Sequence, residues 1–147
     1  MIALGLLFAL LAGAVIAMQT GSNARLKEAF GHALPAVVVS SLIGIVLLGT
    51  LIGVTRTPMP SFGRAMAAPW TAWLGGLLGA VYAVTVVILA RELGAATLTA
   101  AVVTGQLVCS VILDHFGLLG FDVHPVNAGR VIGCVLLLAG TWLIWKF

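Results

Sequence analysis

The chain has 147 residues, of which 62% are hydrophobic and only 7% are charged. So few charged side chains cannot cover the surface of a soluble globule, and the apolar runs reach bilayer-spanning length. The formal net charge of +3 comes from seven scattered Lys and Arg residues, which form no basic stripe of the kind that indicates nucleic-acid binding. Composition therefore predicts an integral membrane protein.

Apolar stretches follow one another along the chain, each about 20 residues long, the length that a helix needs to cross about 30 Å of hydrocarbon. They are continuously apolar and show no in-out alternation, which favours helices over barrel strands. We expect an all-α membrane protein in which residues 1–147 form one five-helix domain. The predicted spans lie near 2–22, 34–54, 69–90, 95–116 and 126–145.

The first span has no positively charged segment before it and precedes four more spans, so we expect it to be kept rather than removed as a signal peptide. Cys109 and Cys134 lie inside predicted helices without CxxC spacing, which indicates neither a metal site nor a disulfide. The chain also has no nucleophile, zinc or nucleotide-binding motif. We expect no enzyme activity, no catalytic residue and no cofactor.

The Lys and Arg residues are nearly balanced between the two sides of the predicted topology. An excess on the cytoplasmic side normally sets orientation, and three against four is almost no bias. Two interpretations stay open: the chain inserts in both directions, so that opposite copies form an inverted repeat, or the single extra charge or a partner chain fixes one orientation. One side holds Arg56, Arg64 and Arg130; the other holds Arg25, Lys27, Arg91 and Lys146.

Polar residues interrupt the apolar run "TGQLVCSVILDHFGLLG" (104–120). Gln106, Ser110 and Asp114 recur every fourth residue and so share one helix face. Gln106 and Ser110 are candidate substrate contacts. Asp114 and His115 stand near the hydrocarbon boundary and are candidate coupling or gating groups. The boundary position favours the alternative, in which Asp114 caps the following turn or pairs with a loop Arg at the interface.

Two further polar features belong to the first and third spans. Gln19 and Asn23 form an i, i+4 amide pair, suited equally to substrate contact and to bonding a neighbouring helix. Tyr82 lies near mid-span, where a phenol needs a partner, so it is the aromatic candidate for a substrate cavity. Small residues spaced by four predict close helix packing. We assign that role to Gly13, Gly75, Gly79, Gly129 and Gly133.

Three segments carry a family resemblance over essentially the whole chain: "AGAVIAMQTGSNARL" (12–26), "PWTAWLGGLLGAVYAV" (69–84) and "LGAATLTAAVVTGQLVCSVILDHFGLLG" (93–120). Together they resemble the five-helix, YdcZ-type branch of the drug/metabolite transporter superfamily. The resemblance implies a half-length transporter whose dimer imitates the ten-helix, inverted-repeat members. It also implies a motif that falls on Gln19, Asn23, Gly75, Gly76, Tyr82, Gly105, Gln106, Asp114 and His115.

Inverted repeats allow a cavity to face either side of the membrane by rocking around a fixed midplane site. We therefore expect an antiparallel homodimer in a bacterial inner membrane that exports or exchanges a small solute by alternating access. No carboxylate stands at mid-span, which favours a neutral or zwitterionic substrate over proton-for-cation exchange. The alternative is a non-transporting membrane subunit or scaffold, or one half of a heterodimeric transporter.

Overall fold

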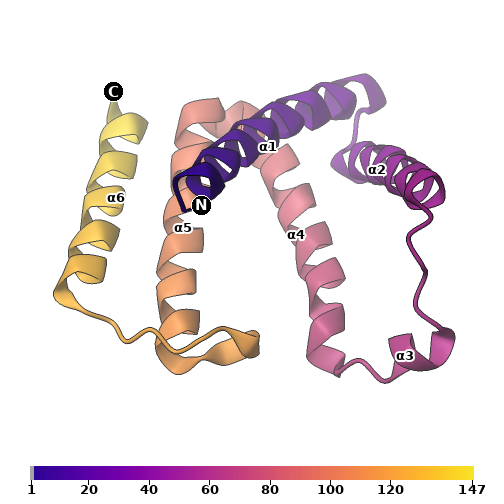
Figure 1. The fold of residues 1–147 in the computed structure, drawn as a ribbon. Coiled ribbons are helices and arrows are strands. Elements are labelled where there is room, and N and C mark those ends of the chain that lie inside the picture. The colour runs from indigo at the N-terminus through magenta and orange to yellow at the C-terminus, as the bar shows by residue number, and fades with distance from the viewer. Residues whose placement is uncertain (1) are drawn as a thin grey trace. The chain divides into compact units, whose positions relative to one another are not determined.

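The computed structural model describes residues 2–147; Met1, the first residue of the predicted domain, lies outside the described residues. Within that range the chain is all-helical, without strands, and five of its helices are long and apolar enough to cross a membrane (Figure 1). The all-α membrane fold is thereby confirmed. The five helices are α1 (Ile2–Phe30), α2 (Ala33–Thr55), α4 (Trp70–Leu93), α5 (Ala95–Phe116) and α6 (Ala128–Lys146).

The first helix is longer than the sequence pattern predicts. We expected a connection over residues 23–33, but α1 continues to Phe30 and breaks at Gly31, whose φ is +77°. The additional turns contain Ala24, Leu26 and Lys27, which have high helix propensity, so the drop in hydrophobicity does not end the helix. Arg25 and Lys27 consequently belong to the last turns of a helix rather than to a loop.

Two short helices fall within predicted connections. The segment between α2 and α4 contains α3 (Phe62–Met66), whose N-cap Ser61 accepts a hydrogen bond from the Arg64 backbone N–H at 3.4 Å. The segment after α5 contains a single 3-10 turn, η1 (Leu118–Gly120). Sequence reasoning treated both segments as irregular because neither has an apolar period long enough to predict a helix.

The chain divides into two compact units, the first ending at Ile88 and the second being Leu89–Phe147. In the first unit, α1 packs against α2. Lys27 on α1 donates a hydrogen bond from Nζ to the carbonyl oxygen of Ile88 on α4, at 3.1 Å. The C-terminal part of α1 therefore makes a defined contact with the end of α4. The buried residues of this unit are Asn23, Ala24, Ala36, Val37, Val86 and Val87.

In the second unit, α5 packs along α6. Leu98 and Thr104 are its buried residues among those described, and the hydroxyl oxygens of Thr104 and Thr141 lie 2.6 Å apart. The Thr141 hydroxyl donates its one hydrogen to the carbonyl oxygen of Ala100, at 3.2 Å, so the Thr104 hydroxyl is the donor of the pair. Polar groups on α5 and α6 thus form hydrogen bonds with one another at this contact.

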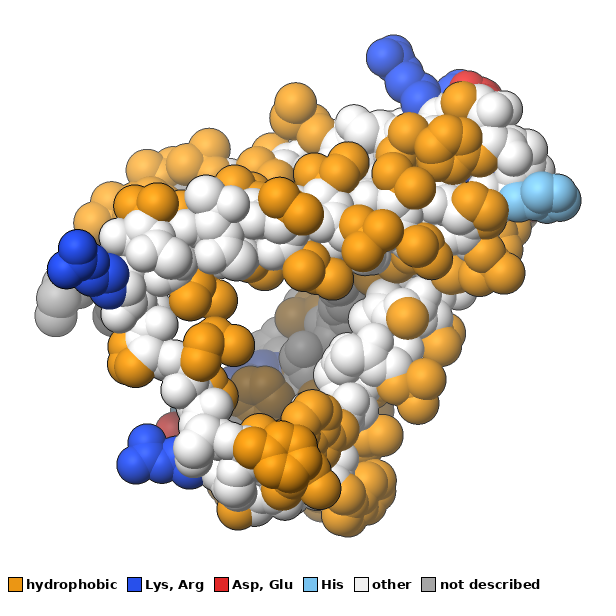
Figure 2. All heavy atoms as spheres, turned by 90° about the vertical axis from the view of Figure 1, so that its right-hand side faces the viewer, with side chains coloured by type: hydrophobic (Ala, Val, Ile, Leu, Met, Phe, Trp, Pro, Cys, Tyr) orange, Lys and Arg blue, Asp and Glu red, His pale blue; other side chains and the backbone are white. Residues whose placement is uncertain are grey.

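The helix surfaces are largely apolar. On the face that Figure 2 shows, hydrophobic side chains are spread along the helices, and Lys, Arg, Asp and Glu side chains occur in only a few places, mostly near its margin. Leu and Val residues along α2 and Trp70 and Trp73 at the start of α4 are exposed. A bilayer provides the apolar surroundings that such surfaces need.

Candidate functional site

Gln106 and Ser110 lie on the side of α5 that faces away from α6. Thr104 marks the α6 side because it contacts Thr141, and Gln106 follows it by two residues, which is about 200° around an α-helix. Ser110 stands one turn after Gln106 and is displaced from it by only about 40°. Both side chains are exposed, so neither is covered within the second unit.

The side chains of Gln106 and Ser110 make no hydrogen bond to another described residue. An amide placed in hydrocarbon without a partner costs roughly 2–7 kcal/mol, depending on the reference state. Near mid-span such a group needs water, a ligand or another helix beside it. The polarity of this side of α5 therefore argues against contact with lipid alone.

In the first unit, α1 carries Gln19 and Asn23 one turn apart, as the i, i+4 spacing predicted. Asn23 is only 7% exposed and lies next to the buried Ala24, whereas Gln19 is exposed. The two amides therefore have different surroundings although they share a helix face. Asn23 has little exposed surface at the packed end of the unit, and Gln19 is more open to contacts outside it.

Tyr82 lies on α4, one turn before the buried Val86. Its side chain is 36% exposed, and its hydroxyl makes no hydrogen bond to another described residue. Inside a membrane-spanning helix, a phenol in this state has an unused donor and acceptor. Tyr82 therefore resembles Gln106 in carrying hydrogen-bonding capacity that its own unit leaves unused.

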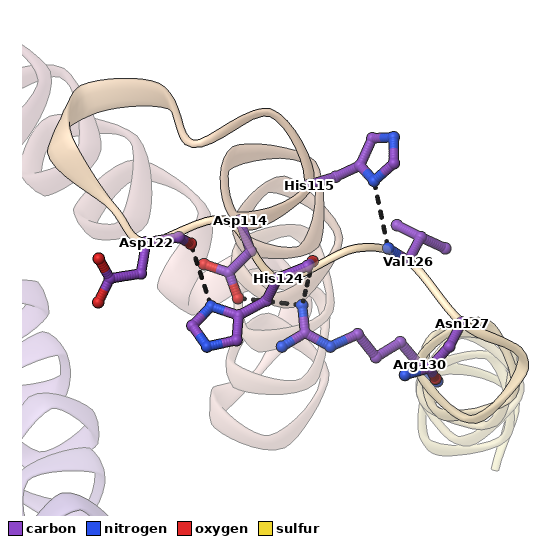
Figure 3. A network of polar contacts seen from close by, with 7 residues as sticks. All are labelled: Asp114, His115, Asp122, His124, Val126, Asn127 and Arg130. Carbon is purple, nitrogen blue, oxygen red and sulfur yellow. Dashed lines mark hydrogen bonds and ion pairs between the residues drawn. The ribbon is translucent and has the colours of Figure 1, made fainter.

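Asp114 behaves differently from Gln106, although both were predicted on one face of α5. Its carboxylate forms a salt bridge with Arg130 in the first turn of α6, with 3.1 Å between Oδ2 and Nη1 (Figure 3). The same Arg130 nitrogen donates to the carbonyl oxygen of His124 at 3.2 Å. Pairing with an arginine was the alternative interpretation of Asp114, and this pairing is present. The arginine belongs to a helix rather than to a loop.

The segment between α5 and α6 is tied to the end of α5 by further contacts (Figure 3). The His124 backbone N–H donates to the carbonyl oxygen of Asp114 at 2.8 Å, and the Val126 N–H donates to Nδ1 of His115 at 3.2 Å. Asn127 caps α6 by accepting from the Arg130 N–H at 3.0 Å. Asp114 and His115 therefore fix where the chain leaves α5 and where it enters α6.

Gly117 lets the chain turn at this point. It ends α5 with φ +61° and ψ +33°, a left-handed conformation that glycine adopts without strain. A Cβ atom at this position would lie 2.7 Å from Cγ2 of Val123. The conformation and the close approach of the returning segment therefore both favour glycine at this position.

Comparison with known proteins supports a transport role. Residues 4–143 match the model of a family described as "Putative inner membrane exporter, YdcZ". The chain belongs to the YdcZ family. It is 30% identical over 142 residues to the inner membrane protein YdcZ of Escherichia coli strain K12, a match that covers 96% of this chain and 94% of that protein. No solved structure shows a significant match.

Membership of the YdcZ family locates the protein in the inner membrane, in agreement with its five membrane-spanning helices. The family description indicates an exporter rather than an enzyme. The resemblance inferred from the three sequence segments is thereby confirmed.

Several residues that organise the second unit were not predicted as site residues. From the sequence we considered Arg130 only in the charge balance between the two sides of the membrane, and we assigned no role to Thr104 or Thr141. A pairing of Arg130 with Asp114 was foreseeable in kind, since a carboxylate near a helix C-terminus is unfavourable without a cation. The Thr104–Thr141 contact had no such signal, because threonines are common in membrane helices and usually bond their own backbone.

The predicted packing glycines do not mark close contacts inside their units. A Cβ atom built on Gly13, Gly75, Gly79 or Gly133 meets no atom of the described chain within 4 Å, apart from its own helix. At Gly129 the nearest atom is Oδ1 of Asn127, at 3.3 Å, within the N-terminal cap of the same helix. Their role in helix packing stays a prediction. Any helix that packs against these glycines would have to belong to the other unit or to another chain.

Proposed function

We propose that this YdcZ-family protein is a small-solute transporter that exports or exchanges a small neutral, zwitterionic or organic metabolite. It works by alternating access as an antiparallel homodimer, in which two five-helix chains supply the two halves of one transport unit. The family description supports export across the inner membrane. The odd number of spans supports the dimer, because copies inserted in opposite directions form an inverted repeat.

The unpartnered polar side of α5 is the observation that carries this proposal. Gln106 and Ser110 are exposed there in a helix of membrane-spanning length, and they have no hydrogen-bond partner in the described chain. Lipid cannot satisfy an amide, whereas a hydrated cavity or a substrate can. A second copy facing this side of α5 would enclose such a cavity.

In this proposal Gln19, Asn23, Tyr82, Gln106 and Ser110 contact the substrate. Their amide and hydroxyl groups donate and accept hydrogen bonds without carrying charge, which suits a neutral or zwitterionic solute. Asp114 and His115 were coupling or gating candidates. Their contacts with Arg130 and Val126 favour a role in anchoring the α5–α6 connection, and gating by Asp114 would require the salt bridge to open during the cycle.

The proposal is tested with proteoliposomes preloaded with a defined mixture of zwitterionic amino acids and neutral sugars, whose efflux is followed by mass spectrometry. Gln106→Ala should slow efflux of the transported component at least tenfold. The control is Ile112→Ala, which truncates an exposed side chain on another side of the same helix and should leave efflux unchanged. Equal efflux by Gln106→Ala and the native protein would remove Gln106 from the site.

Orientation separates the homodimer from a subunit or heterodimer half. Single cysteines placed near both ends of a cysteine-free chain are labelled in intact cells with a membrane-impermeant maleimide. Inverted copies predict that each end is labelled in about half of the molecules, as the near balance of Lys and Arg suggests. Labelling of one end alone would contradict the antiparallel homodimer and favour an opposite partner chain.

A further inference from the structure

A hollow of about 620 Å³ lies in the first unit, where α1 ends, α2 begins and α4 approaches its C-terminus. This volume is within the range of ligand-binding clefts. Lys27 and His32 are its polar lining residues, and the others are glycine or apolar residues, among them Leu34, Val84 and Ile88. None of these residues is among the proposed substrate contacts.

The hollow has an apolar part whose lining includes exposed side chains. Leu34 is 65% exposed and Ile88 is 41% exposed, although each belongs to a helix of membrane-spanning length. Exposed apolar side chains on a membrane-spanning helix are suited to contact with acyl chains. The apolar part of the hollow could therefore take an acyl chain.

The polar part of the hollow is positively charged. Lys27 lies in the last turn of α1, and its Nζ donates to the Ile88 carbonyl oxygen at 3.1 Å, which leaves its other two N–H donors for a ligand. His32 precedes α2 without capping it through its side chain, and the first turn of α2 has no acidic residue. The positive end of that helix therefore adds to the charge of Lys27.

We propose that this hollow binds one anionic phospholipid, with the headgroup phosphate at Lys27 and an acyl chain along Leu34, Val84 and Ile88. The inner-membrane location guarantees contact with lipid. A free phosphate would leave the apolar part unoccupied, and the phosphate of a zwitterionic lipid is already balanced by the cation of its own headgroup, so it attracts the Lys27 ammonium less strongly. The site would fix the packed end of the first unit relative to the membrane surface.

Competitive lipid retention tests the proposal. The purified full-length protein in non-ionic detergent is incubated with equal amounts of phosphatidylglycerol and phosphatidylcholine of the same chain length, washed, and its retained lipid is quantified by mass spectrometry. We expect phosphatidylglycerol to be preferred about fivefold, the ratio that corresponds to about 1 kcal/mol for one basic residue beside an anionic lipid. Lys27→Gln should lower this preference to nearly one, and Lys27→Arg should keep it.

Arg64→Gln is the matched control, because Arg64 is an exposed cation of the first unit outside the hollow. It should leave the preference unchanged. Val84→Phe narrows the hollow without altering charge and should reduce retention of phosphatidylglycerol, with the melting temperature of each variant recorded to exclude unfolding. Equal preference in the Lys27→Gln and native proteins would overturn the proposal. So would inorganic phosphate displacing the retained lipid at equal concentration, since that result indicates a free-anion site.

Discussion

The two sides of α5 differ in how their polar groups are satisfied. Thr104 bonds Thr141 on the side that faces α6, and Asp114, at the C-terminal end of α5, pairs with Arg130. On the opposite side, Gln106 and Ser110 have no partner in the described chain. One helix therefore carries polar groups that are bonded to α6 or its first turn, and other polar groups that need a hydrogen-bond partner from outside the second unit. Polarity inside a membrane indicates function mainly where the chain does not itself satisfy it.

Asp114 and Gln106 differ in whether their side chains have a partner in the described chain, and we expect their roles to differ accordingly. A carboxylate in a membrane helix is an attractive coupling candidate from sequence alone. In the structure the Asp114 carboxylate pairs with Arg130, and the Asp114 backbone carbonyl oxygen accepts a hydrogen bond from the His124 N–H. Substitutions on the two sides should consequently affect different properties: stability on the α6 side and transport on the other.

Gly117→Ala should have the largest effect on stability. The substitution imposes a left-handed conformation on a residue with a Cβ atom and places that atom 2.7 Å from Val123 Cγ2, so we expect a loss of about 2 kcal/mol. Thermal unfolding in detergent measures it. Gly120→Ala is the control, because Gly120 has φ +87° but no atom within 4 Å of the added Cβ, and its loss should be smaller.

Arg130→Gln should have the next largest effect. It removes the partner of Asp114 and the donor to the His124 carbonyl oxygen, at a cost of about 1 kcal/mol for a pair that is partly exposed. A double-mutant cycle with Asp114→Asn measures the coupling free energy. Additive losses would show that the salt bridge contributes nothing to the α5–α6 connection.

Thr104→Val should be milder. It removes one interhelical hydrogen bond while nearly preserving volume, and such bonds contribute about 0.6 kcal/mol in membrane proteins. The hydroxyl of Thr141 keeps its bond to the Ala100 carbonyl oxygen, which limits the loss. A melting temperature as low as that of Arg130→Gln would show that this contact matters more than its geometry implies.

Gln106→Leu should have the smallest effect on stability of the single chain, within about 0.5 kcal/mol, because no contact with a described residue is lost. Transport should nevertheless fall at least tenfold. Unfolding and efflux are measured on the same preparation. A loss of stability comparable to that of Gly117→Ala would mean that Gln106 has a packing role, and the contrast between the two sides would fail.

The sequence predicted the elements well and the side-chain partners only in part. Hydrophobic runs of bilayer length identify five helices because membrane-spanning segments are long and continuously apolar. The predicted end of α1 was wrong because the residues of Ala24–Lys27 still favour a helix after the hydrophobicity of the sequence falls. The pairing of Asp114 was foreseeable in kind, but the choice of Arg130 depends on how the connection turns at Gly117, which spacing along one helix does not encode.

We propose that the side of α5 that faces away from α6 lines a cavity. The accessibility of a thiol at position 106 tests this proposal most directly. In a chain with Cys109 and Cys134 replaced by alanine, Gln106→Cys and Ile112→Cys are compared in membranes with a water-soluble, membrane-impermeant maleimide. We expect labelling of Gln106→Cys and little labelling of Ile112→Cys. Equal protection of both positions would contradict it, because Gln106 would then face lipid.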